Sequence, residues 1–113
     1  MRDLEQFEVV GRTKQVVVAC YRLASQLPDS ERFGLISQMN RAAVSVAANV
    51  AEGIGRGTQG ELEHHLRISQ GSAAELLVLT DLAAELHKLP EDQTHSFVGL
   101  LDSVRKQLTR LTM

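Results

Sequence analysis

The chain has 113 residues, a formal net charge of −2 at pH 7 and a sequence pI near 6.1. Its hydrophobic fraction of 43% and charged fraction of 23% exclude disordered and collagen-like chains. The slightly acidic balance also excludes the strongly basic surface of dedicated nucleic-acid-binding domains, so any such binding would have to be local. One hydrophobic core is enough at this length, and residues 1–113 are expected to form a single domain.

The first expected helix covers residues 8–27. Apolar residues recur there at helical spacing, and Pro28 ends the pattern. The run from Val16 to Val18 favours a strand by propensity, but no hairpin turn follows it, so a helix is the better interpretation. Cys20 has no second cysteine to pair with and is expected to be a buried, inert thiol rather than a reactive one.

The second expected helix covers residues 31–52. It follows the N-cap candidates Asp29 and Ser30, and Gly53 is expected to end it as a left-handed cap. Its apolar positions are Ile36, Met39, Ala43, Val46 and Val50. Their spacings of three, four, three and four residues are typical of a seam between packed helices.

Two further helices are expected at residues 61–89 and 91–111. Glycines between residues 53 and 60 mark the loop before the third helix, and Leu89-Pro90 separates it from the fourth. Four helices joined by such short connections must run antiparallel to their neighbours. The sequence therefore predicts an all-α, antiparallel up-and-down four-helix bundle.

Two short motifs resemble ligand sites but are better explained as a helix connection and helix ends. Residues 55–60 match the dinucleotide-binding fingerprint, which functions only between a strand and a helix, whereas a helix precedes it here. Glu61 and His64 form one Glu-x-x-His, but di-metal bundles need two copies, and Asp92 with His95 lies at a helix start. We therefore expect no catalytic residue, no metal, no cofactor and no small-molecule substrate.

A polar stripe runs along the second expected helix. It consists of Gln38, Arg41, Ser45, Asn49 and Glu52, and it lies roughly 140° around the helix from the apolar seam. Arg41 is the single charged residue between Phe33 and Ala51, whereas an ordinary solvent-facing side would carry charges throughout. The stripe is therefore predicted to form a contact between subunits, with the small residues from Ser69 to Ala74 as a second candidate. A mildly polar solvent-exposed face is the alternative.

The two charged residues of this stripe need partners. Arg41 and Glu52 are about 16 Å apart along a helix axis, which is too far for them to pair with each other. Glu52 also lies at the expected end of a helix, where the helix dipole disfavours a negative charge. Arg56 or an arginine from a neighbouring subunit is expected to compensate Glu52.

Four basic residues are candidates for contact with nucleic acid: Arg56, Arg105, Lys106 and Arg110. The last three lie near a helix C-terminus, where basic side chains also suit the dipole, so a solvated basic turn is the simpler interpretation. The N-terminal residues lack an apolar targeting segment, and no apolar run approaches the roughly 18 residues of a membrane span. These features predict a cytoplasmic protein with no role in a membrane.

Five stretches of the sequence carry a family resemblance. They are ERFGL at 31–35, RAAVSV at 41–46, NVAEGIGR at 49–56, ELEHHL at 61–66 and GSAAEL at 71–76. In order and spacing they resemble the four-helix-bundle family of 23S rRNA intervening-sequence, or S23-type, proteins. Val10, Ala47 and His65 depart from this family, which tends to have Trp, Pro and Phe there, and these differences concern packing.

The resemblance implies bacterial proteins that form ring-like homopentamers and have no established catalytic activity. Some are encoded inside insertions in large-subunit rRNA genes. Related bundles accompany reverse transcriptases in retroelements, but those relatives tend to be basic, and this chain is not. Three interpretations remain: a non-catalytic oligomeric scaffold or adaptor that could associate with RNA or a ribonucleoprotein, a direct nucleic-acid-binding accessory protein, and, third, a metal-dependent enzyme.

Overall fold

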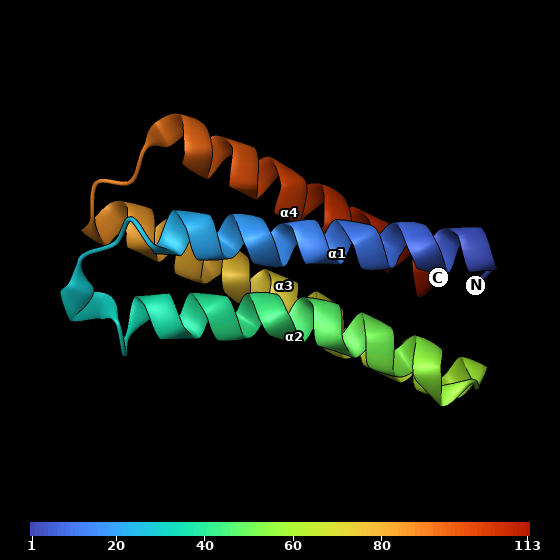
Figure 1. The fold of residues 1–113 in the computed structure, drawn as a ribbon. Coiled ribbons are helices and arrows are strands. Elements are labelled where there is room, and N and C mark those ends of the chain that lie inside the picture. The colour runs from blue at the N-terminus through green and yellow to red at the C-terminus, as the bar shows by residue number, and fades with distance from the viewer.

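The computed structural model describes all 113 residues and consists of four antiparallel α-helices (Figure 1). They are α1 (Asp3–Ala24), α2 (Leu35–Arg56), α3 (Gln59–Leu86) and α4 (Glu91–Leu111), with a short 3-10 helix, η1 (Asp29–Glu31), before α2. Each helix packs against its neighbours in the chain, and α4 also packs against α1. The predicted fold class is confirmed.

The helix boundaries differ from those expected, except for α4. α1 begins at Asp3 rather than near residue 8, because the side chain of Glu5 turns back and accepts a hydrogen bond from the Arg2 N–H at 3.3 Å. α3 begins at Gln59 because Thr58 caps it, with Thr58 Oγ1 accepting from the Glu61 N–H at 3.2 Å. The helix α3 ends at Leu86, three residues earlier than expected.

The expected end of the second helix at Gly53 was wrong. η1 and a turn precede α2, which then continues through Gly53 to Arg56. The left-handed glycine is Gly57, with φ of 81°. Gly53 is helical and buried instead, because the backbone of α3 passes directly beside it: a Cβ there would lie 3.0 Å from His65 Cβ and 3.3 Å from the Leu62 carbonyl oxygen.

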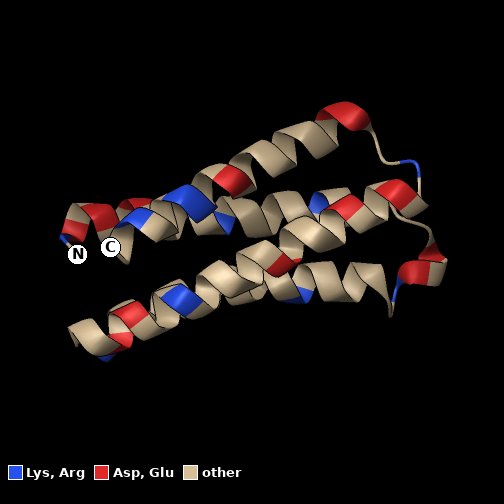
Figure 2. Cartoon of the chain, turned by 180° about the vertical axis from the view of Figure 1, so that it is seen from behind, with Lys and Arg blue, Asp and Glu red and all other residues tan.

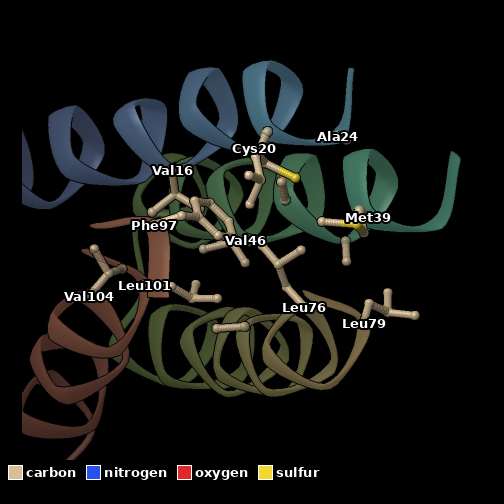
Figure 3. Close-up of a cluster of buried hydrophobic side chains, with 14 of the residues drawn as sticks. Val16, Cys20, Ala24, Met39, Val46, Leu76, Leu79, Phe97, Leu101 and Val104 are labelled. Carbon is tan, nitrogen blue, oxygen red and sulfur yellow. The ribbon is translucent and has the colours of Figure 1, made fainter. Parts of the chain in front are cut away.

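The core is one cluster of aliphatic side chains with Met39, Phe97 and Cys20 among them (Figure 3). Burial raises the pKa of the Cys20 thiol to about 12, in agreement with the expected inert cysteine. Ile36 is only half-buried and Leu86 is 62% exposed, because each lies at the edge of its helix's inward face. None of the helices has both the length and the apolar character of a membrane span.

The connection before α2 is held by one carboxylate. Glu31 Oε2 lies 2.8 Å from His87 Nε2 at the end of α3, and Glu31 Oε1 accepts a hydrogen bond from the Leu35 N–H at 3.3 Å. These contacts, with the His87 hydrogen bond as the larger cause, hold the pKa of Glu31 below its ordinary value. Glu31 therefore ties η1 both to the start of α2 and to the end of α3.

Substitution of Gly53 is expected to separate α2 from α3. Gly53→Val should lower the free energy of unfolding by about 1–3 kcal/mol, because the larger side chain must displace the α3 backbone. Gly11→Val in α1 is the control, since nothing lies within 4 Å of a Cβ at Gly11 and its effect should stay within about 0.5 kcal/mol. Urea denaturation of both variants measures the difference, and equal losses would contradict close packing at Gly53.

The Glu31 contacts predict a pH-dependent part of the stability. Because the pKa of Glu31 is lowered in the folded chain, its contribution is present above its unfolded pKa and is lost as pH falls through the folded value. Glu31→Gln should therefore lower the melting temperature at about pH 6 and have little effect near about pH 2. Thermal melts of both proteins over this range test it, and a constant difference would contradict it.

Candidate functional site

The predicted polar stripe of α2 lies along the groove between α2 and α3. Its central members, Ser45 and Asn49, are half-buried, whereas Gln38, Arg41 and Glu52 are exposed. Asn49 Nδ2 donates to the Ser45 carbonyl oxygen at 2.9 Å and to Ser45 Oγ at 3.1 Å. The two central side chains are thus held in place on the side of α2 that faces α3.

Polar contacts join these two side chains to α3. Ser45 Oγ lies 2.7 Å from Ser72 Oγ, and His65 Nδ1 lies 3.1 Å from Asn49 Oδ1. The amide oxygen of Asn49 can only accept, so Nδ1 of His65 is the donor in this contact. The other ring nitrogen, Nε2, lies 3.5 Å from Glu61 Oε2. A continuous series of polar side chains therefore crosses from α2 to α3.

Arg41 lies beside a small polar cleft in the same groove. The cleft has a volume of about 330 Å³, and Glu75 of α3 lines it opposite Arg41. No nitrogen of Arg41 lies within 4.0 Å of a carboxylate oxygen of Glu75, so the two form no ion pair. Within the chain Arg41 therefore has no charged partner, although the sequence predicts that it needs one.

Glu52 has its partner in the next turn of α2. Glu52 Oε1 lies 2.9 Å from an Arg56 terminal nitrogen and accepts from Arg56 Nε at 3.0 Å, which confirms the expected pairing. The hydrogen bond to Glu52 raises the pKa of Arg56. Both side chains are about half exposed, so the pair adds little to stability.

The outward face of α2 is the feature that the sequence reasoning missed. Val44, Ala48, Ala51 and Gly55 are exposed at spacings of four, three and four residues, and no charged side chain lies among them. The signal was present in the sequence as a second three-four pattern beside the polar stripe. The charge-free surface is therefore this row, and the polar stripe is the adjoining edge of the groove with α3.

The four candidate nucleic-acid contacts are not equally available. Arg56 pairs with Glu52, and Lys106 Nζ lies 3.3 Å from Asp102 Oδ2. Arg105 is half-buried and Arg110 exposed, and neither forms an ion pair. Figure 2 shows short basic segments interrupted by acidic ones on this side of the bundle. Two free arginines of α4 are left for binding an anion.

The motifs with a formal likeness to ligand sites have helical surroundings. Residues 55–60 join α2 to α3, so no strand precedes them as a dinucleotide site requires. Glu61 directs its carboxylate to His65 rather than to His64, whose ring packs edge-on against that of His65 at 5.0 Å. No group of three or more potential metal ligands is present.

Comparison with known proteins identifies the family. A family model described as 23S rRNA-intervening sequence protein matches residues 5–110. A solved structure of a protein of unknown function from the S23 ribosomal protein family of Bacteroides thetaiotaomicron is similar in fold, with a TM-score of 0.86 and 18% identity over 96% of this chain and 97% of that chain. No curated protein gives a significant sequence match. Since the family model spans nearly the whole sequence, the chain belongs to the 23S rRNA-intervening sequence protein family.

Proposed function

We propose that this chain is a non-catalytic scaffold or adaptor that assembles as a homopentamer and has RNA or a ribonucleoprotein as its partner. The observation that carries the proposal is the outward face of α2, from Val44 to Gly55. This face is roughly 17 Å long and free of charge. Such a surface gives a monomer no advantage in water, whereas a neighbouring subunit would bury it.

Differences between the exposed faces of the bundle support a ring. Three of the four residues on the outward face of α2 are alanine or glycine, whereas α3 exposes Val78, Leu82 and Leu86. A contact between two dissimilar surfaces is heterologous, and heterologous contacts that close produce cyclic oligomers. The number five comes from the resemblance to the family. In such a ring the exposed Arg41, at the edge of the α2 face, would find its carboxylate partner on a neighbouring copy.

The RNA part of the proposal draws support from the family and from α4. Arg105 and Arg110 are basic side chains without an ion-pair partner in the chain. Two such residues would bind phosphate weakly in one copy. A ring repeats them around its axis, so contacts that are weak one by one would add through multivalency. Direct nucleic-acid binding is therefore the alternative function for the same residues.

The subunit contact can be tested by placing one charge on the α2 face. Ala48→Arg should reduce the mass measured by light scattering from near five times that of the 12.4 kDa chain toward that of the monomer. Gln15→Arg adds the same charge at an exposed position of α1 and should leave the mass unchanged. Ser45 is unsuitable for this purpose because it also bonds to α3. A monomer mass for the unmodified protein would refute the proposal.

Binding to RNA should be weak for each chain and strongly salt-dependent. Each lost phosphate contact should reduce the slope of log K against log salt by about 1. Arg105→Glu with Arg110→Glu should therefore weaken binding of a labelled RNA oligonucleotide, measured by fluorescence anisotropy, more than Lys106→Glu does, because Lys106 is already paired. Tight binding at high salt, or binding that survives reversal of all four basic residues including Arg56, would contradict this prediction.

A further inference from the structure

We infer that Phe33 of one copy inserts into the groove between α3 and α4 of the next copy. The occupant of this groove is thus a second copy of the chain. The inference rests on the proposed oligomer and adds to it which parts of two neighbouring copies meet.

Phe33 is an aromatic side chain that the chain itself leaves in water. Its exposed fraction is 89%, and the guanidinium of Arg32 lies 5.7 Å from its ring centroid. A single exposed apolar residue is ordinary, but this one is presented by an anchored connection. Glu31, two residues earlier, is bonded both to Leu35 and to His87. The backbone that carries Phe33 is therefore held before any partner binds, which reduces the entropy lost on association.

The groove is formed by the C-terminal half of α3 and the start of α4. Its volume is about 1230 Å³, above the range of about 300–1,000 Å³ for small-molecule pockets, and it is open to solvent. Its apolar lining is Leu77, Val78, Ala84, Leu89 and Val98. Gly99 adds no side chain to the wall, and a Cβ there would meet nothing within 4 Å. These dimensions and this lining suit an aromatic side chain together with the backbone that carries it.

The basic side chain of Arg32, beside Phe33, is opposite in charge to two side chains of the groove. Arg32, next to Phe33, forms no ion pair within the chain. The groove has two carboxylates, Asp81 and Glu91, and its basic members are Lys88 and His95. Figure 2 shows acidic segments both beside the groove and in the connection that carries Phe33. An inserted Phe33 would therefore bring the unpaired Arg32 close to the carboxylates of Asp81 and Glu91.

The two parts also lie at the same level of the bundle. The connection that carries Phe33 and the α3–α4 connection beside the groove are at the same end of the molecule (Figure 1). Rotation about a ring axis parallel to the helices leaves every copy at the same height. A projection and a groove at one end can therefore meet between neighbours all around a ring, and the chain of contacts closes.

The first test compares two exposed phenylalanines. Phe33→Ser should lower the mass measured by light scattering by disrupting the ring, with unchanged helical content because the side chain lies outside the core. Phe7→Ser removes a similarly exposed phenylalanine, 82% exposed and on α1, and should leave the mass unchanged. Arg32→Glu should weaken assembly, and Asp81→Arg in the same chain should restore it. An assembled protein that is indifferent to both Phe33→Ser and Arg32→Glu overturns the inference.

Crosslinking tests the contact directly. Phe33→Cys with Gly99→Cys should, on oxidation, give a ladder of disulfide-linked chains up to the full ring, whereas either substitution alone should give no species beyond a dimer. An assembled protein without this ladder overturns the inference but leaves the proposed scaffold intact, with the subunit contact elsewhere. A monomeric unmodified protein refutes the proposed scaffold, and the inference with it.

Discussion

The close approach of α2 and α3 is the constraint on which the rest of the bundle depends. Gly53 permits this approach, because a Cβ there would lie 3.3 Å from the Leu62 backbone of α3, closer than an ordinary van der Waals contact. Deeper in the same interface, Ser69 Oγ donates to the Val46 carbonyl oxygen at 2.7 Å, so a polar side chain binds the backbone of the opposite helix. Two helices packed this closely fit together in only one lengthwise alignment. The other two helices, α1 and α4, then cover the apolar sides of α2 and α3 that remain.

The polar contacts along this interface also determine which surface of α2 is available for contact with a partner. Ser45 and Asn49 form hydrogen bonds with side chains of α3. The surface of α2 that remains exposed is therefore the neighbouring row from Val44 to Gly55. A polar group buried between helices is costly when its partner is missing, which favours one arrangement over shifted alternatives. The interface between α2 and α3 is thereby fixed by hydrogen bonds, while the row from Val44 to Gly55 on the outer side of α2 stays uncharged.

The sequence predicted the fold class and four helices because their apolar periodicity is local information. It could not distinguish the roles of Gly53 and Gly57, because a glycine serves equally as a left-handed cap or as a point of close packing, and the difference depends on another helix. The polarity of Ser45 and Asn49 was equally visible, but a sequence does not say whether such a side chain faces another helix or another chain. Phe33 was placed inside a helix for the same reason, since the turn before α2 depends on the distant His87.

The burial of Cys20 has a consequence for the chemistry of the chain as a whole. With a thiol pKa of about 12, the reactive thiolate near neutral pH is only about one part in 10⁵. The thiol of Cys20 also donates a hydrogen bond to Asn40 Oδ1, with 3.6 Å between Sγ and Oδ1. Alkylating reagents, maleimide dyes and mild oxidants should therefore leave the native fold unmodified. A cysteine introduced at any surface position would be the one thiol that such reagents detect.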